Sequence, residues 1–327
     1  PFAPHGLWLS PQTDLAALDA AWLAVPEPAD GNWLPPAWTL EVFHPAHVAV
    51  LGPAAWLQAP TVEGLGGLTR IGAVPAGLCW PAFVSGRFQK RQVQGQTWHL
   101  RLDAKAIVAD DAADTLRKFV ALRDAWLLPR SPRTAWTLAT FPGVGDRALP
   151  GFFVLDESRD WFARPTDARL GDFGRRVWLA RLAAAAHFGM SLHGSGNAAP
   201  VLENALAEYA AARLLEAAGF EDDADELRAF WDSAEKSAGP LPMPLALTPA
   251  EEIFAAGRLL SAGARFWVAL EALVRRDRLD QALRTFSSAG TPWSTQDLER
   301  ALVGQDADLA EPLRAFLDAS LYATIKP

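Results

Sequence analysis

The sequence predicts an α+β protein, with a β-sheet amino-terminal domain at residues 1–108 followed by a mainly helical domain at residues 109–327. Before residue 109 the chain consists of short segments rich in Val, Thr, Trp and Phe, separated by Pro and Gly, which is the pattern of strands and turns. After residue 109 the apolar residues recur at helical spacing, and after Gly171 this spacing continues almost to the end of the chain. With 327 residues, 50% of them hydrophobic, the chain is long enough for two cores.

The strands expected in the first domain are short. Residues 85–102, SGRFQKRQVQGQTWHLRL, alternate in polarity on both sides of Gly95 and predict a β-hairpin. The other strands are expected in the segments TLEVFH, HVAVLG, LTRIGAV and AFVSGRF.

The second domain is expected to open with a helix at residues 109–127, where acidic residues precede an apolar stripe. Two strands are expected next, at residues 134–143 and 151–157. Cap signals lie at Thr248 and at Ser294 or Thr295, each followed by acidic residues. The expected helices are 172–190, 200–218, 222–234, 249–274, 279–287, 295–303 and 309–320.

Composition excludes several classes of protein. No run of about eighteen apolar residues exists, so no membrane span is expected. The net charge of −8 is spread along the chain without a cluster of Lys and Arg, which argues against a nucleic-acid partner. Cys79 is the single cysteine, so an intrachain disulfide and a thiolate metal cage are both excluded. The chain is expected to be soluble, with the cytoplasm slightly favoured and no leader sequence.

Residues 181–209, RLAAAAHFGMSLHGSGNAAPVLENALAEY, resemble the zinc site of the M1 aminopeptidases, which are gluzincins. On the pattern HExxHxxFG, Phe188 and Gly189 match the FG, and residues 203–209, ENALAEY, are similar to the NEGFAEY of that family. The gap between residues 185 and 204 matches the family's spacing between its second His and its Glu ligand. This resemblance implies that Arg181, Ala185 and Asn204 occupy the three metal-ligand positions, and Leu182 the position of the general base.

Further segments extend the resemblance over nearly the whole chain. Residues 146–158 look like the exopeptidase motif GAMENPGLI, with Ala148 in place of the Glu that holds a substrate's amino group. Residues 253–267 are similar to the helix that carries the transition-state tyrosine, with Phe254 in its place. The family relationship implies a saddle-like first domain, which starts part-way through its strands and is therefore expected to be incomplete, and a thermolysin-like second domain.

Several residues near the former metal positions allow more than one interpretation. Glu208, His187 and Tyr209 are candidates for a supporting or cleft-lining role. Glu208 could pair with Arg181, or Arg181 could extend toward solvent from a partly buried helix. A different metal site built from His187 and His193 with Glu203 or Glu208 is a further alternative. The HGSGN segment at residues 193–197 lacks a nucleophile elbow and is expected to be a flexible loop.

The resemblance implies an M1 homologue that has lost its zinc ligands and general base, with no zinc or other cofactor. Its expected role is that of a non-catalytic peptide-binding, protein-binding or structural subunit. The alternative is an aminopeptidase with a non-standard metal site. Expected partners are a peptide ligand or a second polypeptide, which could be the missing amino-terminal segment, another copy of the chain or an active paralogue.

Overall fold

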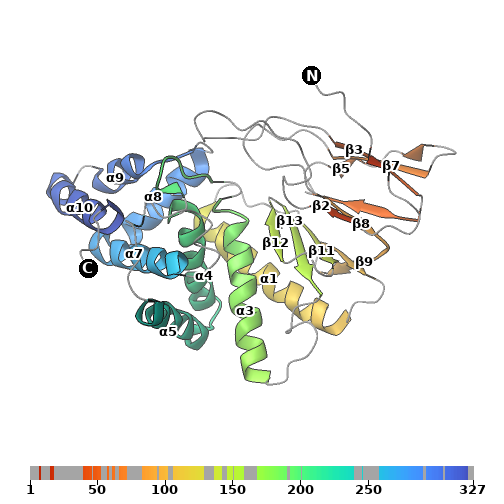
Figure 1. Ribbon diagram of the computed structural model, residues 1–327, viewed down its shortest axis with the longest axis horizontal. Coiled ribbons are helices and arrows are strands. Elements are labelled where there is room, and N and C mark those ends of the chain that lie inside the picture. Colours follow the sequence, from red (N-terminus) through yellow and green to blue (C-terminus); the bar gives the residue numbers. More distant parts are fainter. Residues whose placement is uncertain are drawn as a thin grey trace. The chain divides into compact units, whose positions relative to one another are not determined.

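The computed structural model describes two compact units (Figure 1). One unit takes in residues 1–114 and 133–172, and the other takes in residues 115–132 and 173–327. The domain boundary expected between residues 108 and 109 stays a prediction. The described residues are 7–8, 15–17, 40–45, 47–52, 57–58, 61–62, 66–71, 83–93, 96–101, 106–128, 136–141, 146–149, 151–157, 168–189, 192–199, 201–238, 245, 258–289, 292–304 and 306–322.

The described strands of the first unit form three sheets. The first has the order β1 (Leu7–Trp8), β3 (Leu40–His44), β7 (Gly66–Ile71) and β5 (Leu57–Gln58), with β6 (Thr61–Val62) also on β7. The second has the order β2 (Leu15–Ala17), β8 (Phe83–Gly86) and β4 (Ala49–Leu51). The third has the order β12 (Arg147–Leu149), β13 (Phe152–Asp156), β11 (Thr137–Phe141), β10 (Gln96–Arg101) and β9 (Phe88–Val93).

The predicted hairpin is confirmed in the third sheet. Strands β9 and β10 pair antiparallel, and Val93 lies opposite Gln96, so a two-residue connection that includes Gly95 joins them. Gly95 itself lies outside the described residues. Trp98 and Leu100 are buried, whereas Thr97 and His99 are partly exposed, as the alternation in the sequence predicts. The two strands expected in residues 134–157 are also confirmed, as the parallel pair β11 and β13.

The second unit is mainly helical (Figure 1). Helix α4 is its most buried element, and helices α5 and α7 pack against it. Because α4 is covered on several sides, most of its residues are apolar or small, and the polar side chains that it does carry need partners inside the unit. Its described helices, with α1 and α3 starting in the first unit, are α1 (Ala106–Leu127), α3 (Ala168–Ala185), η3 (Val201–Ala205), α4 (Leu206–Ala217), α5 (Glu221–Ala238), α7 (Arg258–Val274), α8 (Arg276–Ala289), α9 (Thr295–Val303), η5 (Ala307–Leu309), α10 (Ala310–Leu317) and η6 (Asp318–Tyr322).

The predicted fold class is confirmed. Prediction and structure differ at the ends of the helices. The helix expected at 172–190 ends at Ala185 because Gly189 takes a φ of 84° and a tight turn follows. In this turn Leu192 N–H donates to His187 O, and Gly189 N–H donates to Leu192 O, both at 2.8 Å. The expected helix 200–218 begins with the π-helical turn η3.

Other predicted helix features hold. Helix α9 has a capping box, in which the Ser294 hydroxyl and the Asp297 carboxylate each accept a backbone N–H of the other residue. The cap expected at Thr248 lies outside the described residues, as does the start of the helix expected at 249–274. Within the described part of the chain, no helix is both long enough and apolar enough to cross a bilayer.

Candidate functional site

The candidate site lies where helix α3 ends and helix α4 begins, within the second unit. The two helices are joined by residues 186–205, the last five of which form η3, and the middle of this connection is attached to Trp293 by backbone hydrogen bonds. Ser195 N–H donates to Trp293 O at 2.8 Å, and Trp293 N–H donates to His193 O at 3.0 Å. The HGSGN segment, expected to be a flexible loop, is therefore held by hydrogen bonds at His193 and Ser195. Gly196 and Asn197 are its exposed residues.

A buried ion pair connects the two helices at this point. Arg181, on the last turn of α3, donates from Nε to Glu208 Oε2 and from Nη2 to Glu208 Oε1, at 2.5 Å each. Trp231 of α5 donates from Nε1 to the same Oε1 at 2.9 Å. The Glu208 side chain is 4% exposed and that of Arg181 is 29% exposed. The hypothesis of an Arg181–Glu208 pair is thus confirmed over that of an Arg181 directed at solvent.

The geometry of this cluster makes Glu208 its centre. A buried carboxylate is costly unless hydrogen bonds replace the water that it has lost. Here two N–H groups of a planar guanidinium and one indole N–H supply three such bonds, and the guanidinium also supplies the opposite charge. The Trp178 ring lies 5.9 Å from Arg181 Cζ and covers part of the cation. These hydrogen bonds link α3 and α5 to α4 through Glu208.

The residues that the resemblance aligns with the zinc ligands and the general base fall on two elements, α3 and η3. Leu182 and Ala185 are on α3 with Arg181, and Asn204 is on η3, one turn before Glu208. Leu182 is buried, while Ala185 and Asn204 are half-buried. Among the described residues, no three or more His, Cys, Asp or Glu side chains converge on one point.

His187 is a packed core side chain, 2% exposed. Its Nε2 lies 2.8 Å from Ser287 Oγ, and Ser287 Oγ in turn donates to Leu283 O. Because the hydroxyl proton is used there, Nε2–H is the donor in the bond between His187 and Ser287. The imidazole also packs edge-on against Phe188, with 5.0 Å between ring centroids.

Tyr209 joins a second polar network on the other side of α4. Its hydroxyl donates to Glu271 on α7 and accepts a 3.3 Å hydrogen bond from Arg213. Burial raises the pKa of Tyr209 far above its usual range, and the bond to Glu271 raises it further, so the hydroxyl stays protonated. Arg213 is held in turn by Asp280 of α8. Tyr209 therefore connects α4 with α7, and through Arg213 with α8.

Of the four residues considered for an alternative metal site, His193 and Glu203 lie near each other. His193 Nδ1 lies 3.6 Å from Glu203 Oε1, and the same oxygen accepts the Gly194 N–H at 2.7 Å. His187, the other histidine of that hypothesis, bonds to Ser287 instead. The two remaining residues predicted from the resemblance are Ala148, which is buried in β12 of the first unit, and Phe254, which lies outside the described residues.

Sequence reasoning did not identify Trp231 or Glu271 as parts of these networks. Both lie on amphipathic helices whose patterns predict only an apolar and a polar face. Which polar group on another helix they reach depends on how the helices pack. The one available signal is that a buried Trp or Tyr needs a partner for its N–H or O–H group, which predicts a partner without naming it.

Comparison with known proteins shows the fold. Chains similar to this one include the M1 zinc metallopeptidase from Deinococcus radiodurans (TM-score 0.62, 23% identity), matched over 89% of this chain and 65% of that one. Native yeast LTA4 hydrolase is also similar (TM-score 0.66, 14% identity), over 89% of this chain and 47% of that one. The chain thus spans just under two thirds of the Deinococcus protein. No family model and no curated protein matches the sequence. At these identities the comparisons establish an M1 aminopeptidase-like fold.

Proposed function

We propose that this chain is a non-catalytic relative of the M1 metallopeptidases, without zinc, that binds a peptide or protein or acts as a structural subunit. The observation that carries this proposal is the ion pair of Arg181 with Glu208 at the junction of α3 and α4. The resemblance aligns Arg181 with the first zinc-ligating His. The positively charged guanidinium of Arg181 would then lie where the family binds its metal.

The residues aligned with the zinc site do not suit zinc. Arg181 carries a permanent positive charge and has no lone pair to give to a metal. Leu182 and Ala185 have no donor atom, and the amide oxygen of Asn204 is a weak ligand compared with His, Cys or a carboxylate. Loss of the general base alone costs a factor of about 10² to 10⁴ in rate. The substitutions therefore act together against metal binding and against hydrolysis.

A peptide is the ligand class that the relatives suggest. A mutant of the Deinococcus M1 zinc metallopeptidase has been solved with a Tyr-Ser-Ala substrate (TM-score 0.60, 20% identity). A protein that keeps such a fold and loses the catalytic groups can still offer shape complementarity to a peptide, because binding and chemistry depend on different residues. The second polypeptide expected as a partner remains part of this proposal.

The alternative is an aminopeptidase with a non-standard metal site. The observation in its favour is the 3.6 Å approach of His193 Nδ1 to Glu203 Oε1. A catalytic zinc site uses three protein ligands, and this pair supplies two donors at most. The pair is also occupied with the Gly194 N–H. We therefore favour the non-catalytic role.

Metal analysis with a restored site as its control tests the proposal. The purified chain should contain far less than one zinc per molecule after incubation with zinc and desalting, and it should not hydrolyse aminoacyl substrates. The control carries Arg181→His, Leu182→Glu, Ala185→His and Asn204→Glu, which rebuild the ligand set on α3 and η3. It should retain about one zinc per chain if the alignment is right.

Two results would contradict the proposal. The first is about one zinc per native chain together with peptidase activity that chelation removes. The second is a folded control variant that retains no more zinc than the native chain, because the four positions would then not converge and the alignment of Arg181 with a ligand would fail.

A further inference from the structure

A second site lies between helices α4, α5 and α7, beside the start of α8, and separate from the positions aligned with the zinc site. It is a cavity of about 280 Å³ in the second unit. Tyr209 and Ala212 come from α4, Trp231 from α5 and Val268 from α7, and they make its walls largely apolar and aromatic. Small-molecule sites typically have volumes of roughly 300 to 1,000 Å³, so this one suits a small ligand.

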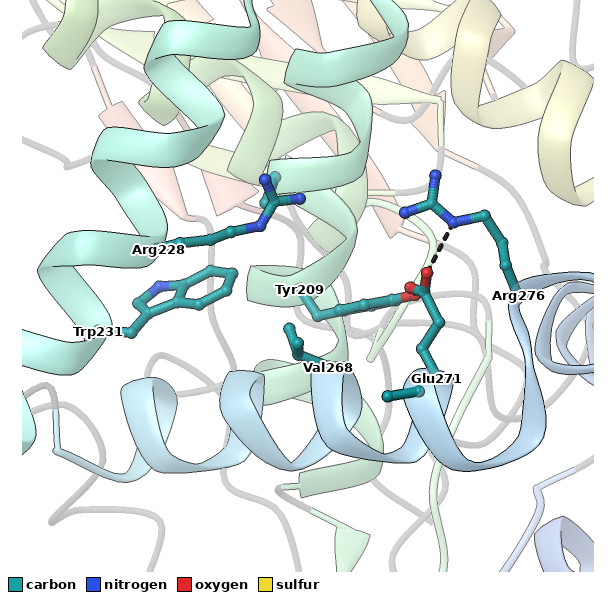
Figure 2. Close-up of a pocket in the computed structure, with 8 residues that line it drawn as sticks. Tyr209, Arg228, Trp231, Val268, Glu271 and Arg276 are labelled. Carbon is teal, nitrogen blue, oxygen red and sulfur yellow. Dashed lines mark hydrogen bonds and ion pairs between the residues drawn. The ribbon is translucent and has the colours of Figure 1, made fainter.

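In the described part of the chain, three charged side chains line the cavity: Arg228, Arg276 and Glu271. Figure 2 shows Arg228 and Arg276 on opposite sides of it, with the Tyr209 ring and Val268 between and below them. Of the described residues that line it, Glu271 is the one carboxylate. Glu271 already accepts from the Tyr209 hydroxyl through Oε2 and from Arg276 Nε, at 2.7 Å, through Oε1. A cationic ligand would therefore meet two guanidinium groups and a carboxylate that is already engaged.

Arg276 has one guanidinium edge that makes no hydrogen bond to a described residue. Its Nε donates to Glu271, while Nη2 lies 3.6 Å from Glu216 Oε2, which is an ion-pair distance but too long for a hydrogen bond. The edge formed by Nη1 and Nη2 makes no hydrogen bond to any other residue that the structure describes. Because Glu271 fixes the guanidinium through Nε, that edge is held in one orientation, and a carboxylate can accept two parallel N–H bonds from it.

Arg228 adds positive charge from the other side. It donates to Glu216, and from Nη1 to Asp225 Oδ1 at 3.0 Å. The Asp225 side chain is 77% exposed, so this surface pair contributes little and a ligand can compete with it. Glu216 pairs with both arginines, so Glu216 and Glu271 together balance their formal charge, which favours a ligand with one negative group over a multiply charged one.

We propose that this cavity binds a small aromatic carboxylate, with its ring over Val268 and its carboxylate on the Nη1–Nη2 edge of Arg276, facing Arg228. Val268 is 40% exposed, so a ring placed there covers apolar surface that is otherwise in contact with water. This site is independent of the proposed loss of catalysis, since none of its lining residues is aligned with a zinc ligand or the general base.

Calorimetric titration of the full chain with benzoate tests the proposal. Benzoate should bind saturably at one site, while benzyl alcohol, which lacks the carboxylate, and inorganic phosphate, which lacks the ring, should not saturate over the same concentration range at matched ionic strength. Arg276→Gln should weaken benzoate binding at least tenfold and Arg228→Gln about threefold, because a bidentate charged contact contributes more than a facing charge.

Two further variants complete the experiment. Arg278→Gln is the matched control, because Arg278 lies on the same helix, pairs with Asp306 and does not line the cavity, and it should leave the affinity unchanged. Val268→Trp should abolish binding by filling the cavity without changing any charge. Absence of saturable benzoate binding, equal binding of benzyl alcohol or phosphate, or an equal effect of Arg278→Gln and Arg276→Gln would overturn the proposal.

Discussion

At the scale of single residues, Glu208 shows how one buried carboxylate organises its surroundings. It is 4% exposed and accepts hydrogen bonds from two side chains that lie on different helices, Arg181 and Trp231. The motif ENALAEY is enough to make Glu208 a candidate for a supporting role. Of its two partners, Arg181 is one of two alternatives that the sequence allows, and the sequence gives no indication of Trp231.

Arg181→Met should destabilise the protein by about 3 kcal/mol, because it leaves the Glu208 carboxylate buried without its counter-charge. Denaturant unfolding followed by circular dichroism measures the loss. The control is Arg314→Met, which removes an ion pair with Glu299 from an arginine whose side chain is 66% exposed, and which should cost less than about 1 kcal/mol. A loss from Arg181→Met no larger than that of the control would mean that the buried pair contributes nothing net.

At the scale of elements, the close approach of α7 to η3 determines which residues fit. Trp267 of α7 donates from Nε1 to Val201 O, in the π-helical turn η3, at 2.9 Å. Gly263 of α7 lies directly against Ala205, so that a methyl group at Gly263 would be 2.4 Å from Ala205 Cβ. These contacts hold the segment that carries Asn204.

Gly263→Ala should therefore destabilise the protein by about 1 to 3 kcal/mol through overpacking, although alanine is the better helix former. Gly174→Ala is a matched change in helix α3, where nothing lies within 4 Å of the added methyl group. It should be neutral or should stabilise the protein by up to about 1 kcal/mol. Thermal unfolding of both variants measures the difference, and stabilisation of the protein by Gly263→Ala would show that the two elements are not in close contact.

At the scale of the whole molecule, both units hold ionisable groups away from water. In the second unit, buried polar side chains of α4 are matched with partners on neighbouring helices, as for Glu208 and Arg213. In the first unit, His99 lies on β10 directly opposite Lys90 of β9 and is mostly shielded from water. Burial, helped by the positive charge of Lys90, lowers the pKa of His99 from 6.5 to about 4.

This shift predicts acid sensitivity of the sheet-rich unit. Between pH 6.5 and about 4 the unfolded chain binds a proton at His99 that the folded chain does not, so stability falls as the pH is lowered through this window and levels off below it. His99→Gln should remove this part of the pH dependence. His47→Gln, at an exposed histidine of the same unit, is the control and should retain it. Melting temperatures measured from pH 7.5 to 4 test the prediction, and identical profiles for His99→Gln and the native chain would refute it.

The sequence by itself determined the class of fold, the hairpin at β9 and β10, the capping box of α9 and most of the helices. These features depend on residues close together in the chain, such as the alternation around Gly95 or the Ser294 and Asp297 spacing. The motif at residues 181–209 also gave the Arg181–Glu208 pair as one of two alternatives, and the structure decided between that pair and an Arg181 directed at solvent.

Only the tertiary structure decided where α3 ends, which partner completes Glu208 and where a cavity with two facing arginines lies. Helix α3 ends before the apolar pattern does, because Gly189 and Leu192 find hydrogen bonds in a turn instead. Trp231 and Glu271 lie on different helices from the residues that they contact on α4, Glu208 and Tyr209. Periodicity predicts which face of each helix is buried, but packing alone decides which polar groups on those faces meet.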